Sequence, residues 1–106
     1  MPVSVTDHPD AHRYEIRTDG DLAGFAAYRA QPGRIDFVHT EIDPQFAGHG
    51  LASDLIRHAL DDARARGLAV LPYCPFVLGF IERHEEYRDL VPEQDRSLFG
   101  LSDGTA

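Results

Sequence analysis

The residues of this sequence best suited to chemistry surround a glycine-rich segment at residues 43–53. The segment contains the pattern Gln-x-x-Gly-x-Gly, formed by Gln45, Gly48 and Gly50. Glycine lets a backbone come close to a ligand because it has no Cβ atom. A helix beginning here would direct its free N–H groups and the positive end of its dipole into the turn. The segment therefore predicts a binding site for an anion such as phosphate or pyrophosphate.

Two better-known phosphate loops are excluded. A Walker A loop has Lys and then Ser or Thr after its second glycine, but Leu51 and Ala52 stand there. A dinucleotide fingerprint needs a third glycine, which is missing. His49 and Ser53 are candidates to hydrogen-bond the same anion. A histidine in a loop can equally face solvent without binding a ligand, and a serine early in a helix often serves only as a local cap.

Cys74 is the most suggestive single residue. Pro75 favours the first position of a helix, so we expect Cys74 at or beside the N-cap. The positive end of a helix favours a thiolate, and ligands of open α/β sheets bind at the carboxyl ends of strands. The alternative is a small buried apolar side chain. The position of Cys74 leads us to favour a functional thiol.

His39 and Glu41 are expected on one face of a strand, because side chains repeat every two residues. Either is a candidate general base for an ammonium group, and either is equally well explained as an ordinary strand-end side chain. His-x-Glu also begins the zinc-deaminase signature, but the required Pro-Cys-x-x-Cys is absent. We therefore expect no metal.

Phe76 and Phe80 follow Cys74 on the same predicted helix. Both are candidates to form the wall of a slot for the arm of a cofactor. For Phe80 we favour packing in the core.

The elements that position these residues are predicted to form an α/β fold with a mixed sheet. Strands are expected at residues 13–17, 22–29 and 34–42, with a hairpin at Asp19-Gly20. A helix follows to about Arg66, with one apolar stripe formed by Leu51, Leu55, Ile56, Ala59, Leu60 and Ala63. A short strand at 68–71 is expected to lie parallel to the third strand after a right-handed crossover. A second helix begins near Pro75.

The domain is predicted to span residues 10–92. Residues 1–9 show no periodicity and are expected to form a flexible arm. Residues 89–91 are expected to form a short strand or a loop. Residues 93–106 are mostly polar and are expected to form a weakly ordered tail, despite Leu98, Phe99 and Leu101.

Composition limits the possible functions. A chain of 106 residues allows one domain with a modest core. The net charge of −8 disfavours nucleic-acid partners. It would attract a cationic amine, but we favour the simpler interpretation that it keeps the protein soluble. No apolar run reaches the roughly 20 residues that span a membrane, and the first residues do not resemble a signal peptide. A single cysteine fits the reducing cytoplasm. We expect a monomer or a weak dimer.

Several segments together resemble the small, single-domain members of the GNAT family, the acyl-CoA-dependent acetyltransferases. They are the glycine pattern, His39-Thr40-Glu41 before it, and residues 71–76 and 84–91 after it. The resemblance covers roughly residues 10–92. It implies a minimal GNAT fold in which two parallel strands splay apart and acyl-CoA fits between them.

The resemblance also implies roles for individual residues. Backbone from Thr40 to Ile42 would pair with the pantetheine amides. In similar proteins the positions of His39, Glu41 and Cys74 lie near the acetyl group, and the cysteine is a proposed catalytic residue. The N–H groups that would hold the pyrophosphate belong to Gly48, His49, Gly50, Leu51 and Ala52.

Two departures from larger GNAT enzymes follow from the sequence. Their second helix carries a tyrosine that acts as an acid, whereas here no tyrosine occurs until Tyr87. They also have a helical segment between their first strands, whereas Asp19-Gly20 is expected to join those strands directly. The acceptor side is therefore expected to be open and shallow.

Our main hypothesis is an N-acetyltransferase that uses acetyl-CoA as co-substrate and acts on an unidentified amine, on a small molecule or a protein. Transfer would be direct, with Glu41 or His39 as base, or would pass through a thioester on Cys74. One alternative is a non-catalytic module that binds acyl-CoA or regulates. Another is an interaction domain that uses the apolar tail at residues 98–101.

Overall fold

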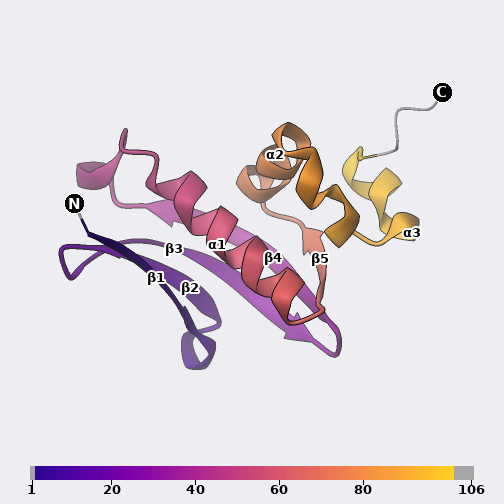
Figure 1. Ribbon diagram of the computed structural model, residues 1–106, viewed down its shortest axis with the longest axis horizontal. Coiled ribbons are helices and arrows are strands. Elements are labelled where there is room, and N and C mark those ends of the chain that lie inside the picture. The colour runs from indigo at the N-terminus through magenta and orange to yellow at the C-terminus, as the bar shows by residue number, and fades with distance from the viewer. Residues whose placement is uncertain (1, 102–106) are drawn as a thin grey trace.

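The computed structural model describes residues 2–101 and contains one five-stranded sheet of order β1-β2-β3-β4-β5 (Figure 1). The first four strands are antiparallel neighbours, and β5 is parallel to β4. The predicted mixed α/β sheet, with a meander and then a crossover, is confirmed. The strands are β1 (Val3–His8), β2 (Arg13–Thr18), β3 (Asp21–Gln31), β4 (Arg34–Ile42) and β5 (Ala69–Pro72).

The helices are α1 (Leu51–Ala65), α2 (Pro75–Arg83) and the short α3 (Glu93–Arg96). Figure 1 shows α1 lying lengthwise across the sheet, where it contacts all five strands. The second helix packs beside α1 and against β4 and β5. Single 3-10 turns or short 3-10 helices occur at Pro9–Ala11, Pro44–Phe46, Glu85–Leu90 and Ser97–Phe99. None of the described helices is long and apolar enough to cross a membrane.

The apolar stripe predicted for α1 is the part of the helix that enters the core. Its six residues are all buried, because the 3.6-residue period places them on the side that faces the sheet. Gly67 follows the helix with φ +69°, the left-handed conformation that ends many helices. The sequence therefore predicts both the buried face and the end of α1.

Two tyrosine hydroxyls at the core boundary bond to carboxylates. Tyr14 of β2 donates to Asp62 of α1 at 2.5 Å, and Tyr28 of β3 donates to Asp7 of β1. Burial, together with the hydrogen bond to the carboxylate, raises the pKa of each phenol above its ordinary value. Both phenols therefore stay neutral, and the hydrogen bond of Tyr14 links β2 to α1.

The first residues do not form the expected flexible arm. Residues 3–8 form the edge strand β1, which pairs with β2 from Val3↔Thr18 to His8↔Arg13. Val3 and Val5 alternate with polar residues, and Val5 packs against the core. The first strand connection is therefore the turn Pro9–Ala11, and Asp19-Gly20 joins the second and third strands instead.

The described part of the predicted polar tail also differs from the expectation. Residues 93–101 form α3 and a 3-10 turn, and the side chain of Leu101 is only 1% exposed. The ring of Phe99 packs edge-on against Tyr73, with 5.2 Å between centroids. Residues 89–91 do not form a strand, because Glu85–Leu90 is a 3-10 helix. The rest of the predicted tail, 102–106, lies outside the described residues.

A β-bulge at Val38 decides which way the end of β4 faces. Tyr28 pairs with Phe37, whereas the preceding Ala27 pairs with His39, so Val38 is the extra residue. Before the bulge, Phe37 points toward α1, where its ring meets that of Tyr14. After it, even-numbered residues point toward the helices and odd-numbered ones toward the opposite face of the sheet, here called the outer face.

Candidate active site

Strands β4 and β5 are paired only at their first residues. The ladder joins residues 34–37 to residues 69–72, and Cys74 then donates its N–H to the carbonyl of Phe37 at 2.9 Å. Beyond that point the chain turns into α2, while β4 continues to Ile42. Within residues 2–101, residues 38–42 therefore have a strand partner, β3, on one side only. Their free edge can pair with an extended ligand that carries amide groups.

The glycine segment beyond β4 leaves backbone N–H groups free. Gly48 and Gly50 have φ of +85° and +72°, which explains why glycines stand there. Gly50 is the N-cap of α1 and supplies no side-chain cap. In the described chain, Asp54 is the first residue after the loop whose N–H finds an acceptor, the carbonyl of Gly50 at 3.2 Å. The N–H groups of residues 48–53 are therefore available to an anion.

A groove of about 340 Å³ lies along this helix start. It brings together most of the residues predicted to bind the cofactor, and its wall is formed by Ile42, Phe46, Ala47, Gly48, Gly50, Leu51, Ala52, Ser53 and Phe76. The free N–H groups fit the pyrophosphate of acyl-CoA, and the apolar side chains fit its pantetheine arm.

Four predicted cofactor residues do not line this groove. Thr40 lies instead at the unpaired edge of β4, with its hydroxyl beside Cys74. Phe80 is fully buried, as the favoured assignment to the core predicted. His49 lies in the loop and is exposed. Gln45 donates its backbone N–H to Asp43 at 3.0 Å, which shapes the turn before the glycines.

Cys74 is the N-cap residue of α2 and is only 3% exposed. Its sulfur lies 3.3 Å from the hydroxyl oxygen of Thr40, across the opening between β4 and α2. The bulge at Val38 makes this contact possible, because it turns Thr40 toward the helices. The thiol therefore adjoins the unpaired edge of β4.

His39 and Glu41 lie on the outer face, as their spacing predicted. His39 Nε2 is 3.1 Å from Glu41 Oε2, and both side chains are well exposed. The ring of His39 also approaches that of Phe25, with 6.0 Å between centroids. These two side chains therefore lie on the face of β4 opposite to the one that Cys74 contacts through Thr40.

The outer face also carries a buried carboxylate. Glu15 is 5% exposed and is paired with Arg13 at 2.7 Å and with Arg17 at 3.1 Å. Burial alone would raise the pKa of Glu15, but the hydrogen bonds from the two arginines outweigh it and lower the pKa. Glu15 is therefore ionised at neutral pH, and it neutralises the charge of Arg13.

A second hollow, on the side of Glu41, was missed by the sequence analysis. Its volume is about 210 Å³, and it is lined by Leu22, Ala23, Gly24, Phe25, Glu41, Asp43 and Pro44. The repeat of acidic residues at positions 41 and 43 was the only sequence pattern pointing to it. Apart from Pro44, the remaining lining comes from the start of β3.

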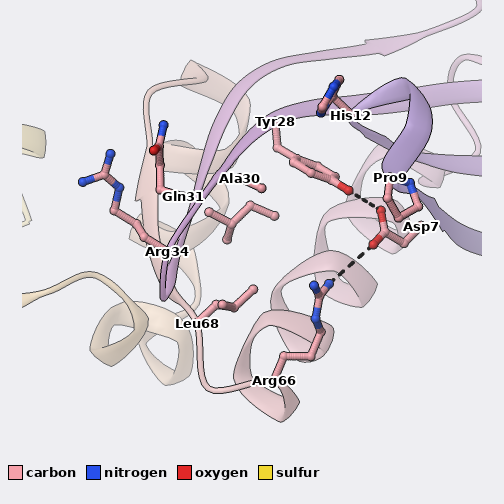
Figure 2. A pocket seen from close by; sticks show the side chains of 10 residues that line it. Asp7, Pro9, His12, Tyr28, Ala30, Gln31, Arg34, Arg66 and Leu68 are labelled. Carbon is pink, nitrogen blue, oxygen red and sulfur yellow. Dashed lines mark hydrogen bonds and ion pairs between the residues drawn. The ribbon is translucent and has the colours of Figure 1, made fainter.

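A third hollow, of about 290 Å³, lies near the C-terminal end of α1 (Figure 2). Figure 2 shows its acidic group, Asp7, bonded to Tyr28 and paired with Arg66. These polar groups are therefore hydrogen-bonded or ion-paired with one another. Because α1 has 15 residues and rises about 1.5 Å per residue, this hollow lies roughly 20 Å along the helix from the glycine loop.

The tyrosines differ in their availability as acids. Tyr87 is buried and donates to Asp61 at 2.7 Å, and burial raises its pKa. Of the four tyrosines in the chain, Tyr73 alone is substantially exposed, at 47%, and it directly precedes Cys74. Residues 2–101 contain no group of three side chains arranged to hold a metal ion; the absence of a metal stays a prediction.

Comparison with known proteins identifies the family. A family model described as GCN5-related N-acetyl-transferase matches residues 13–90. Streptothricin acetyltransferase of Streptomyces lavendulae is 46% identical over 54 residues, which are 49% of this chain and 29% of that protein. The matching part thus spans less than a third of the length of this relative.

Solved structures share the fold. A GCN5-like protein of Staphylococcus aureus has a TM-score of 0.64 at 19% identity, covering 84% of this chain and 87% of that one. A ribosomal-protein-alanine N-acetyltransferase of Brucella melitensis has a TM-score of 0.51 at 23% identity, covering 70% and 59%. An N-acetylglutamate synthase of Neisseria gonorrhoeae, complexed with coenzyme A and N-acetyl-glutamate, has a TM-score of 0.50 at 20% identity, covering 91% and 26%.

The family match covers most of the chain and includes the strand opening, the glycine loop and Cys74. This chain therefore belongs to an enzyme family, the GCN5-related N-acetyl-transferases.

Proposed function

We propose that this protein transfers an acetyl group from acetyl-CoA to an amine. The observation that carries the proposal is the set of free N–H groups at the start of α1, placed directly beyond the unpaired edge of β4. One feature suits a diphosphate, and the other suits the amide groups of pantetheine. Family membership supports the same co-substrate, and it does not favour a module that only binds acyl-CoA.

The residues that would hold acetyl-CoA follow from this placement. Backbone N–H groups of residues 48–52, with the hydroxyl of Ser53, bind the pyrophosphate. The backbone of Thr40 and Ile42 pairs with the pantetheine amides, and Phe76 packs against the arm. Acetyl-CoA supplies the activated thioester.

The remaining residues act on the acceptor and on the thiol. His39 or Glu41 takes the proton from the ammonium group of the acceptor, directly or through water, because both are exposed on the outer face. Cys74 adjoins the opening from the helix side. It is proposed to take the acetyl group as a thioester with release of the CoA thiol, after which the amine attacks and frees the Cys74 thiol, or to border the site during direct transfer.

The first test is stabilisation by acetyl-CoA. Ligand at about 100 times its dissociation constant stabilises the folded state by roughly 2.7 kcal/mol. For a domain of this size the melting temperature should rise by about 10–20 °C. No rise would contradict the proposed coenzyme site.

A pair of glycine variants makes this test specific. Gly50 and Gly33 have nearly equal φ, +72° and +70°, and an added Cβ would meet nothing within 4 Å at either position. Gly50→Ala and Gly33→Ala should therefore lose similar stability through backbone strain. Only Gly50→Ala should also lose most of the acetyl-CoA-dependent rise. Release of free thiol from acetyl-CoA, measured against a panel of amines, then tests the transfer.

A further inference from the structure

The hollow on the outer face has a charge pattern that points to a ligand. It lies between the start of β3 and the end of β4, and its charged side chains, Glu41 and Asp43, are both acidic. Opposite them stand the apolar side chains of Leu22, Phe25 and Pro44. Leu22 is 37% exposed and is therefore accessible to a ligand.

Each carboxylate keeps one oxygen free. Asp43 uses Oδ1 to accept from the N–H of Gln45, and Glu41 uses Oε2 toward His39. Asp43 Oδ2 and Glu41 Oε1 have no hydrogen bond to any residue in the range 2–101. Two acceptor atoms are therefore available to a donor in the hollow.

The arginines near the hollow are already paired with another carboxylate. The guanidinium of Arg13 lies over the ring of Phe25, 4.7 Å from its centroid. It is already paired with the buried Glu15 at 2.7 Å. Arg17, the ladder partner of Leu22, is paired with the same carboxylate at 3.1 Å. The hollow therefore favours a cation, in a protein whose net charge of −8 attracts cations at long range.

The hollow lies farther along β4 than His39, on the same face of the strand. His39 and Glu41 are two residues apart on one face of β4, or about 7 Å, because a strand rises about 3.3 Å per residue. Asp43 follows in extended conformation, at φ −58° and ψ 130°. An acceptor whose reacting amine lies at His39 would thus reach the hollow with a chain that is several methylene groups long.

We propose that this hollow binds a second ammonium group of the acceptor, so that the acceptor is an aliphatic diamine or polyamine. The carboxylates of Glu41 and Asp43 bind the distal ammonium, and the apolar residues pack against the methylene chain. In this arrangement His39, and not Glu41, is the base for the reacting amine. This inference rests on the proposed acetyl transfer, because it names the acceptor of that same site.

The test compares matched amines that differ in one charge. The kcat/KM for acetylation is measured for 1,5-diaminopentane against pentylamine and for 1,8-diaminooctane against octylamine. Each exposed ion pair contributes only a few-fold, so two of them predict a preference for the diamine of roughly tenfold. The preference should weaken as salt is added.

Two variants locate the effect. Asp43→Asn keeps an oxygen that can accept from the N–H of Gln45 but removes the charge, and it should lower the ratio of diamine to monoamine rates several-fold. Asp10→Asn removes the same charge from an exposed turn distant in sequence, and it should leave the ratio unchanged. Equal loss in both variants would overturn the subsite, because it would indicate only general attraction.

Direct binding separates this inference from the proposed function. Calorimetric titration of the protein with 1,8-diaminooctane in the presence of coenzyme A measures occupancy without turnover. Binding without acetylation would overturn the transfer but keep the subsite. Equal acetylation of diamines and monoamines would overturn the subsite but keep the transfer. A lysine peptide preferred over every free diamine would also overturn the subsite, and an absence of both binding and turnover would overturn both.

Discussion

The hydroxyl oxygen of Thr40 and the sulfur of Cys74 lie 3.3 Å apart across the opening between β4 and α2. Thr40 is half-buried at the unpaired edge of the strand, and Cys74 begins the helix. The contact gives the thiol a fixed neighbour that can donate a hydrogen bond to it. It also shows how the bulge at Val38 serves the site, because without the extra residue Thr40 would point to the outer face.

Thr40→Val should reduce acetyl transfer while changing the melting temperature little. Valine has nearly the shape of threonine but cannot donate a hydrogen bond to the sulfur. A hydrogen bond to a charged group contributes about 1.5–3 kcal/mol, so acetylation of Cys74, followed by intact mass, should slow at least tenfold. Thr40→Ser should retain most of the rate. Equal rates for Thr40→Val and the wild type would show that the hydroxyl does not position the thiol.

The place of Gly24 at the β3–β4 contact gives a second prediction. A Cβ at Gly24 would overlap the carbonyl oxygen of Glu41 and the Cδ1 atom of Ile42. Gly24→Ala must therefore displace the end of β4, at a cost of about 1–3 kcal/mol, and the melting temperature should fall by roughly 5–20 °C. Because Ile42 lines the coenzyme groove, binding of acetyl-CoA should weaken as well.

Gly79→Ala is the matched control. Gly79 lies inside α2, and an added Cβ would meet only the flexible end of Arg83, at 3.3 Å. Alanine is preferred over glycine within a helix by about 1 kcal/mol. The variant should therefore melt at or above the wild-type temperature. A loss equal to that of Gly24→Ala would contradict the explanation from close strand approach.

The pH dependence of stability should depend on Glu15. Its pKa in the folded protein lies below the ordinary value of about 4.3, so ionised Glu15 stabilises the fold fully above that value. This stabilisation is lost as the pH falls through the lowered pKa. Wild-type protein should thus show a decline in melting temperature below about pH 4.3, measured from pH 7 to pH 3.

Glu15→Gln tests this assignment. Glutamine cannot be deprotonated, so the variant should melt lower than the wild type at pH 7, and the difference should shrink as the pH approaches 3. A constant difference across this range would assign the acid sensitivity to other carboxylates. Asp89, whose pKa is lowered by Arg64, is the next candidate.

The parts of the fold predicted correctly have strong local patterns. The stripe of α1 repeats over 15 residues, and both its glycine-flanked ends depend on positive φ, which few residues other than glycine adopt. Pro75 likewise marked the start of α2 and placed Cys74 at its N-cap. These features follow from neighbouring residues alone.

The features that the sequence analysis missed depend on register or on distant partners. The alternation in β1 covers only four residues and has meaning only once β2 is beside it. The bulge at Val38 is visible only from the pairing with β3, although it decides which face Thr40 occupies. The outer-face hollow joins residues about 20 positions apart, from the start of β3 and the end of β4.

The C-terminal segment gives the last prediction, because its two leucines look alike in the sequence but occupy opposite environments. Leu101 is 1% exposed and belongs to the core, and its N–H donates to the carbonyl of Arg96 at 2.7 Å. Leu98 is 66% exposed. Leu101→Ala should cost about 2–4 kcal/mol through lost burial and a cavity, lowering the melting temperature by roughly 10–25 °C. Leu98→Ala should change it by no more than a few degrees. Equal, small effects in both variants would mean that this segment does not complete the core.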